Sequence, residues 1–214
     1  MYKVIILFLA IVTISAKEKL LVQITQEIPY IEVKDSGVDI RISRIQDTGN
    51  KLTDDFVKTS RVCPPFCVQK ITPIKGVKTI AELELIDFIE NRVYKKKGLL
   101  VDARLKKLFL LETIPGAINI PFTIALSDSK KVKNTLFNIL GATKNKDGSY
   151  DFSKAKELAV FCNGIWCEQS PIFIKAMVEH GYPKEKLYYY RSGMQGWKLL
   201  GLTTVVHKAK RVEK

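Results

Sequence analysis

The chain has 214 residues, which is enough for one well-buried domain with a smaller addition but excludes two full-sized domains. Hydrophobic residues make up 46% of the chain and charged residues 27%, a balance that excludes disorder on a large scale. The formal net charge of +13 favours anionic partners such as small oxyanions, acidic lipid or nucleic acid.

Residues 1–16 have the layout of a secretory signal peptide. Lys3 supplies a positive charge, residues 4–14 form an almost unbroken apolar run, and the small residues Ser15 and Ala16 follow. The run is too short to span a bilayer, since a transmembrane helix needs about 20 apolar residues. We therefore expect cleavage, export to the periplasm or beyond, and no membrane span afterwards, with an N-terminal anchor as the alternative. Export also argues against nucleic acid as a ligand.

Residues 17–75 are expected to form a β-rich extension. From residue 20 to about residue 61 the overall pattern has a period of two, and the apolar stretches 20–24, 30–33 and 38–42 predict short strands separated by turns. The segment is too short to be a confident domain of its own. It ends in the sequence Cys63-Pro64-Pro65-Phe66-Cys67, where the prolines exclude a helix and predict a rigid connector.

The four cysteines form two close pairs, Cys63 with Cys67 and Cys162 with Cys167. In an oxidising compartment an even number favours disulfides, and four cysteines allow three full connectivities, among which the sequence does not choose. For Cys63 and Cys67 a structural disulfide or a rigid corner without metal is the leading interpretation, and pairing with the other two is the alternative. We expect no metal site, because neither histidine lies near either pair in the sequence.

From residue 76 to residue 206 the pattern changes to strands alternating with helices, and residues 207–214 form a basic tail. This alternation predicts an α/β fold with a parallel sheet and helices on both of its faces. The expected strands are residues 99–101, 116–120, 158–161 and 187–190. The expected helices are residues 80–92, opened by a capping box of Thr79 and Glu82, then 130–140, the segment ending at His180, and 194–200.

Cys162 stands directly after an apolar strand and directly before a helix. Ligands of open α/β sheets bind at the carboxyl ends of the strands, so this position is favoured for a functional residue. Backbone N–H groups of the loop and of the helix start are expected to lower the pKa of the thiol and make it a better nucleophile. Gly164 allows a tight loop, and Ser170 with Pro171 suits a helix cap and first turn.

Three motifs in order resemble the signatures of the rhodanese family, of an exported bacterial type, over residues 77–206. The first is Leu-Val-Asp-Ala-Arg at 100–104 with Ile-Pro-Gly-Ala-Ile-Asn-Ile-Pro at 114–121. The second is the active loop Phe-Cys-Asn-Gly-Ile-Trp-Cys at 161–167. The third is Gly-Tyr-Pro at 181–183 with Arg-Ser-Gly-Met-Gln-Gly-Trp at 191–197.

The resemblance implies a sulfurtransferase without a cofactor, in which Cys162 accepts sulfane sulfur as a persulfide. Thiosulfate or a related small anionic donor would supply the sulfur, and a thiol or cyanide would accept it. The resemblance also implies that Asp102 and Arg104 shape the site and that Gly193 and Trp197 pack the fold. The active loop then comprises Cys162, Asn163, Gly164, Ile165, Trp166 and Cys167, with Glu168 directly after it.

The loop departs from the family pattern because it contains no Arg or Lys, and Glu168 follows it instead. This departure argues against efficient thiosulfate turnover and against the phosphatase relatives of the fold, whose loops bind phosphate through an Arg.

Cys167 raises an alternative: it could resolve a persulfide or sulfenic acid on Cys162 and form a disulfide. A static disulfide, simple packing of Cys167, and an inactive domain that serves as a binding module for an unidentified protein are further interpretations.

Overall fold

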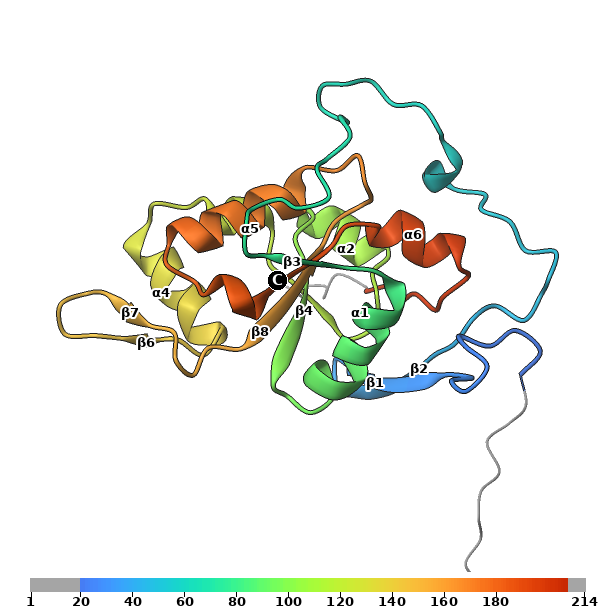
Figure 1. Ribbon diagram of the computed structural model, residues 1–214, viewed down its shortest axis with the longest axis horizontal. Coiled ribbons are helices and arrows are strands. Elements are labelled where there is room, and N and C mark those ends of the chain that lie inside the picture. Colours follow the sequence, from blue (N-terminus) through green and yellow to red (C-terminus); the bar gives the residue numbers. More distant parts are fainter. Residues whose placement is uncertain (1–19, 208–214) are drawn as a thin grey trace, which may run out of the picture.

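The computed structural model describes residues 20–207, so the expected signal peptide and residues 208–214 of the basic tail lie outside the described residues. A five-stranded parallel sheet forms the centre of the molecule (Figure 1). Its strands, in spatial order, are β3 (Lys78–Ile80), β9 (Leu187–Tyr190), β8 (Glu157–Phe161), β4 (Gly98–Asp102) and β5 (Ala117–Asn119). The α/β fold with a parallel sheet is confirmed.

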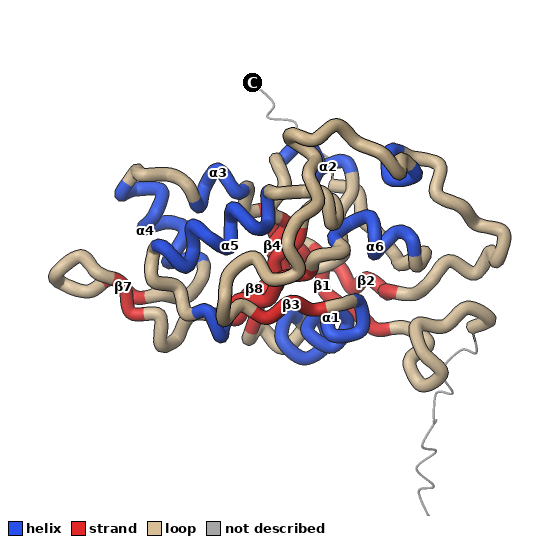
Figure 2. Tube along the Cα trace, turned by 45° about the horizontal axis from the view of Figure 1, so that its top comes forward, coloured by secondary structure: helices blue, strands red, loops and turns tan. Residues whose placement is uncertain are grey.

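Side chains alternate between two hydrophobic cores, one on each face of the sheet. Along β8, Leu158 and Val160 enter one core, whereas Ala159 and Phe161 enter the other, as the period of two in a strand requires. The first core is covered by α3 (Phe122–Ala125), α4 (Lys130–Ile139) and α5 (Gln169–Glu179). The second is covered by α1 (Glu82–Phe88), its continuation η2 (Ile89–Val93), and α6 (Gly193–Leu199), as Figure 2 illustrates.

The N-terminal extension contributes a hairpin to the second core. Strands β1 (Ile31–Asp35) and β2 (Val38–Ile42) pair in antiparallel register. The inward side chains Ile31, Val33 and Ile42 are at most 3% exposed and join the same cluster as Trp197. The extension is therefore packed on the sheet domain and shares its core.

The strand expected at residues 20–24 is not formed. The backbone of Val22 pairs instead with the side-chain amide of Gln46, which donates to the Val22 carbonyl at 2.8 Å and accepts from its N–H at 3.1 Å. The backbone N–H of Ile24 bonds the Ile28 carbonyl in a turn. Period-two alternation predicted a strand here, but the segment has no neighbouring strand to complete its hydrogen bonds.

The expected start of the helix at residues 80–92 is also wrong. Thr79 lies in β3, where it pairs with Tyr189 of β9, and its hydroxyl donates to the carbonyl of Ile71. Helix α1 begins at Glu82, and the capping carboxylate belongs to Glu84, which accepts from the N–H of Ala81 at 3.1 Å. Pairing with β9 overrides the local capping signal because it satisfies the backbone in the sheet.

Residues 43–77 cross the outside of the molecule between β2 and β3 (light blue to teal in Figure 1) and include the single turn η1 (Asp55–Val57). We call residues 54–69 the strap. Cys63 and Cys67 form a disulfide in it, with Cα atoms 4.6 Å apart, and the peptide bonds before Pro64 and Pro65 are cis.

The remaining elements lie outside the sheet. Helix α2 (Lys106–Leu111) follows β4 and buries none of its residues. A small hairpin of β6 (Thr143–Lys144) and β7 (Tyr150–Asp151) and the turn η3 (Lys184–Lys186) complete the described elements. Across residues 20–207, none of the helices combines the length and apolar character needed to cross a membrane.

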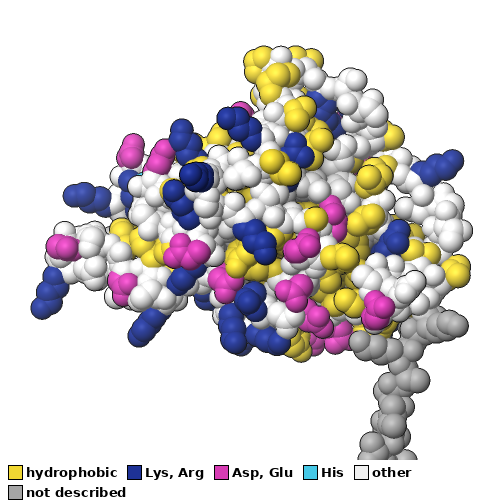
Figure 3. Space-filling view, in the orientation of Figure 1, with side chains coloured by type: hydrophobic (Ala, Val, Ile, Leu, Met, Phe, Trp, Pro, Cys, Tyr) yellow, Lys and Arg dark blue, Asp and Glu magenta, His cyan; other side chains and the backbone are white. Residues whose placement is uncertain are grey.

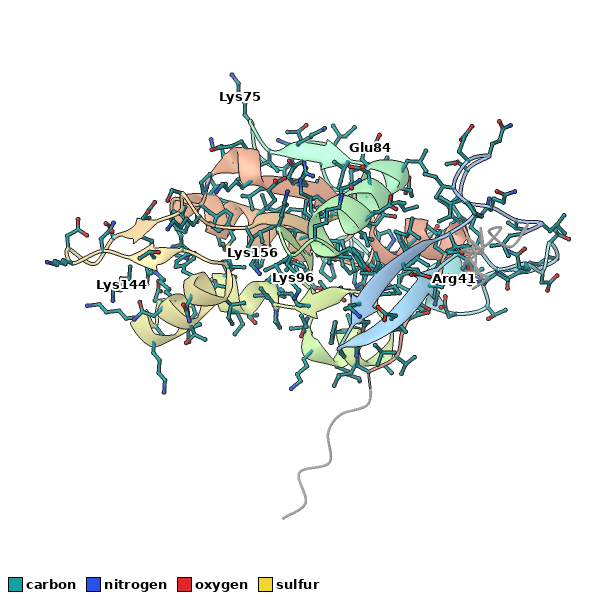
Figure 4. All side chains as sticks on the ribbon, turned by 90° about the horizontal axis from the view of Figure 1, so that it is seen from below. Arg41, Lys75, Glu84, Lys96, Lys144 and Lys156 are labelled. Atoms are coloured by element: carbon teal, nitrogen blue, oxygen red, sulfur yellow. A yellow bond between two sulfur atoms is a disulfide. The ribbon has the colours of Figure 1, made fainter. Side chains whose placement is uncertain are left out.

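Basic side chains are spread over the surface of the molecule. Lys and Arg are dispersed among acidic and neutral residues on the face in Figure 3. Lys75 next to β3 and Lys144 in the β6–β7 hairpin lie far apart in Figure 4. The net positive charge therefore gives no single basic patch on the views shown.

Candidate active site

Cys162 lies at the carboxyl end of β8, and α5 begins seven residues later at Gln169. The residue is 2% exposed. Its sulfur accepts a hydrogen bond from the Ser170 hydroxyl at 3.0 Å, and as a thiol it donates to the Cys167 carbonyl at 3.2 Å. The backbone N–H groups of Gly164 and Ser170 also lower the pKa of this thiol. The turn from strand to helix therefore surrounds one sulfur atom with donors.

Burial by itself raises the pKa of Cys162, because a thiolate loses solvation when it leaves water. The hydrogen bonds from Cys167, Ser170 and Gly164 act in the opposite direction and outweigh burial, so the net shift of this pKa is downward. In Cys167 the hydrogen bond with Cys162 and then burial both raise the pKa. Of the two free cysteines, Cys162 therefore has the lowered pKa and Cys167 the raised one, so Cys162 is the more easily ionised.

Ser170 has a different role from the helix cap expected from the sequence. The residue at the cap of α5 is Glu168, which makes no side-chain capping bond. Ser170 lies inside the first turn of α5, is fully buried, and donates to the Cys162 sulfur. In the sequence, the only indication that Ser170 would contact the sulfur was its position shortly after Cys162 and near the start of a helix. A helix-capping residue has the same position, so the sequence did not distinguish the two roles.

Asp102 and Arg104 form a buried ion pair at the end of β4. Arg104 contacts the carboxylate of Asp102 through Nε at 2.9 Å and Nη2 at 2.7 Å, and Thr113 donates to the same carboxylate at 2.8 Å. The guanidinium then reaches the active loop, where Nη1 donates to Asn163 Oδ1 at 3.2 Å. Asp102 thus orients Arg104, and Arg104 ties β4 to the loop of Cys162.

The turn that opens α6 packs directly against the active loop. The N–H of Met194 donates to the Cys162 carbonyl, and the N–H of Gln195 donates to the Asn163 carbonyl, both at 2.9 Å. Gly193 has a φ of +56°, and a Cβ at this position would lie 2.3 Å from the Cys162 carbonyl oxygen. Only glycine allows this approach, which holds the backbone of the loop in place.

The strap covers the other side of the loop. The N–H of Gln69 donates to the Ile165 carbonyl at 2.8 Å. The guanidinium of Arg61 lies 3.9 Å above the Trp166 ring, and Phe66 meets that ring edge-on with centroids 5.5 Å apart. No local pattern in the sequence predicted that the strap would contact the active loop.

A pocket of 360 Å³ opens between the strap, α2 and the active loop. From the active loop, Asn163 and Trp166 line it, and Arg104 lies beside them. Glu168 is exposed and lies outside this lining, whereas Cys167 is 5% exposed and Gly164 is buried. Within residues 20–207, no group of three or more His, Cys, Asp or Glu side chains is arranged to hold a metal ion.

Comparison with known families gives one assignment. The family model of the rhodanese-like domain matches residues 84–200, which is more than half of the chain. The chain belongs to the rhodanese-like domain family. The matched region of this rhodanese-like protein contains Cys162, Arg104 and Gly193, whereas the strap precedes it. Membership supports a sulfur-transfer family for the chain.

Among solved structures, the rhodanese-like protein is similar to a rhodanese-like domain from Anabaena sp., with 16% identity and a TM-score of 0.42, covering 64% of this chain and 84% of that one. A rhodanese-related protein from Thermoplasma volcanium has 19% identity and a TM-score of 0.40, with coverages of 60% and 97%. A thiosulfate sulfurtransferase from Pseudomonas aeruginosa has 16% identity and a TM-score of 0.40, with coverages of 63% and 21%. No curated protein matches the chain in sequence.

Proposed function

We propose that Cys162 carries sulfane sulfur as a persulfide and passes it to a thiol or cyanide acceptor. The observation that carries this proposal is the set of donors around the Cys162 sulfur, which lowers the pKa of a thiol that burial alone would keep protonated. Sulfur transfer requires a thiolate as nucleophile, and a lowered pKa increases the fraction of Cys162 in that form. The arrangement therefore supplies a reactive sulfur in a fixed position.

With thiosulfate as donor, the Cys162 thiolate attacks the outer sulfur. The bond between the two sulfur atoms of thiosulfate breaks, and sulfite leaves with the electron pair, so the charges of reactants and products balance. In the second half-reaction a thiolate or cyanide attacks the terminal sulfur of the persulfide and releases the Cys162 thiolate. The donors from Gly164 and Ser170 stabilise the negative charge on Cys162 before and after each cycle.

A second candidate function uses Cys167 as a resolving residue. The closeness of the two residues favours it, because the Cys162 thiol donates to the Cys167 backbone carbonyl at 3.2 Å and both cysteines are buried in the same site. In this reaction Cys167 attacks the inner sulfur of a Cys162 persulfide, a disulfide forms between the two residues, and hydrogen sulfide leaves. The raised pKa of Cys167 slows this step, so persulfide transfer to an external acceptor is the primary proposal.

Export to the periplasm or another oxidising compartment is part of the proposal. The Cys63–Cys67 disulfide supports it, since structural disulfides persist in such compartments and are rare in a reducing cytosol. The predicted partners are a small anionic sulfur donor and a thiol acceptor.

Intact-mass analysis tests the persulfide. Reduced protein is exposed to thiosulfate and to other sulfane donors, with Cys162→Ser and Cys167→Ser in parallel. We expect the mass to rise by one sulfur atom in the wild type and in Cys167→Ser but not in Cys162→Ser. If the persulfide accumulates only in Cys167→Ser, Cys167 resolves it. If no donor adds sulfur to Cys162, the proposed function is wrong.

A further inference from the structure

Tyr189 lies on the same face of the sheet as Cys162, on the neighbouring strand. In the parallel pairing of β8 with β9, Tyr189 is the partner of Val160, and both side chains enter the core that α5 covers (Figure 1). Cys162 follows Val160 by two residues, so the period of two in a strand directs its side chain to that face as well. The phenol and the active-site thiol are therefore on one side of the sheet, under the same helix.

The hydroxyl of Tyr189 is buried and unpaired. The residue is 0% exposed, and its hydroxyl has no hydrogen-bond partner among the described residues. Buried tyrosine hydroxyls usually find one. Two other buried tyrosines do, since Tyr182 donates to the carbonyl of Lys156 and Tyr190 donates to the carboxylate of Glu82. Tyr189 is the exception, so its hydroxyl is available to a group that arrives during the reaction.

The charge of the active site lies close to this hydroxyl. Burial raises the pKa of Tyr189, and the negative charge of a Cys162 thiolate raises it further, as does Cys167 to a smaller extent. The charge of Arg191 and the nearby hydroxyl of Ser170 act in the opposite direction without reversing the shift. A phenol with a raised pKa keeps its proton around neutral pH. Tyr189 is therefore a hydrogen-bond donor beside the sulfur of Cys162.

Uptake of sulfur moves the negative charge of the site. In the resting thiolate the charge lies on Sγ of Cys162, which accepts from the Ser170 hydroxyl at 3.0 Å. In the persulfide it lies on the outer sulfur, one sulfur–sulfur bond of about 2.05 Å away. The hydroxyl of Ser170 already serves the inner sulfur, so the new position of the charge calls for a donor that the resting site leaves unused.

We propose that Tyr189 is a catalytic residue whose hydroxyl donates a hydrogen bond to the outer sulfur of the Cys162 persulfide. This inference rests on the proposed function. No bond of the phenol is made or broken, because the hydroxyl keeps its proton and acts on the charge alone. A hydrogen bond to a charged sulfur stabilises the persulfide. Since the contact forms only after sulfur has arrived, it favours the loaded state over the resting thiolate.

An equilibrium measurement tests this role. A sulfane donor loads Cys162 and its leaving group removes the sulfur again, so the loaded fraction depends on the ratio of the two. Intact mass gives this fraction with thiosulfate and sulfite, and with methanethiosulfonate and methanesulfinate. All variants carry Cys167→Ser, which prevents the second thiol from consuming the persulfide. Tyr189→Phe removes only the hydroxyl, and we expect the ratio of leaving group to donor at half loading to fall by at least about tenfold.

Tyr190→Phe is the matched control. Tyr190 is the next residue of β9, enters the opposite core and pairs with Glu82 at 3.3 Å. Loss of this bond should lower stability in urea unfolding and leave the ratio at half loading unchanged. Tyr189→Phe should show the reverse, with stability unchanged or raised, because a buried hydroxyl without a partner is removed. A general loss of packing would lower stability and loading together, and would contradict the role proposed for Tyr189.

The pH profile of Cys162 alkylation by iodoacetamide separates the persulfide from the thiolate. The Tyr189 hydroxyl is unpaired in the resting site, so Tyr189→Phe should leave the midpoint of this profile unchanged. An unchanged ratio at half loading, or a midpoint that moves by as much as the ratio, would overturn the role of Tyr189 in the intermediate and leave sulfur transfer intact. If neither donor loads a protein that retains Tyr189, the proposed function fails and this inference fails with it.

Discussion

Replacing Ser170 with alanine should weaken the nucleophile without removing it. The Ser170 hydroxyl donates to the Cys162 sulfur at 3.0 Å, and a hydrogen bond to a charged group contributes about 1.5–3 kcal/mol. Loss of this energy from the thiolate raises the pKa of Cys162. At a fixed pH below that pKa, the thiolate fraction should fall by about tenfold or more. At alkaline pH the fraction should recover, because ionisation is then complete in both proteins.

The assay is the rate of alkylation of Cys162 by iodoacetamide as a function of pH, with the modified residue located by peptide fragmentation. Ser129→Ala is the matched control. This serine caps α4, where its hydroxyl accepts from the N–H of Val132, so its loss costs about 1 kcal/mol of stability without contact to Cys162. We expect the midpoint of the pH profile to move upward in Ser170→Ala and to stay fixed in Ser129→Ala. An unchanged midpoint in Ser170→Ala would refute this explanation of the lowered pKa.

The same shift has a consequence for stability. The pKa of Cys162 in the folded state lies below its ordinary value of 9.0, so the unfolded state binds more protons between these two values. Stability from this group is therefore fully present above pH 9 and is lost as the pH falls through the folded pKa. Ser170→Ala should destabilise the protein more at pH 9 than at acidic pH, which urea unfolding at several pH values would measure.

Three further predictions concern the fold. Gly193→Ala should cost at least about 2 kcal/mol in urea unfolding and slow the alkylation of Cys162, because the new Cβ meets a carbonyl oxygen at 2.3 Å and φ is positive; a neutral substitution would contradict the packing described here. Replacing Cys63 and Cys67 together with serine should cost about 2 kcal/mol and expose the strap to proteases, and an unchanged thermal midpoint would argue against this. Burial raises the pKa of Tyr182 above its ordinary 10.0, so its stabilising effect is present below pH 10 and lost above it. Tyr182→Phe should therefore lose less stability than the wild type as the pH rises past 10, and parallel unfolding curves would show this to be wrong.

The helices and strands around Cys162 could be predicted from local patterns in the sequence. The apolar strand β8, the turn at Cys162 and the helix that follows it are adjacent in the sequence, so periodicity and motif spacing were sufficient to predict them. Local signals failed at the edges. Residues 20–24 are as apolar as a strand but have no strand beside them, and Thr79 resembles a helix cap but pairs with Tyr189.

The sequence by itself determined the parallel α/β sheet, its two covered faces and the place of Cys162 at a strand end, because each depends on hydrophobic periodicity and turn residues within short segments. Only the tertiary structure decided that the strap lies on Trp166 and that Ser170 faces the sulfur. The physical reason is that the first contact depends on the course of the strap across the surface, and the second on the rotation of α5 about its axis. Neither is encoded in the residues of one short segment. The difference in pKa between Cys162 and Cys167 has the same origin, since it depends on where each donor lies in space.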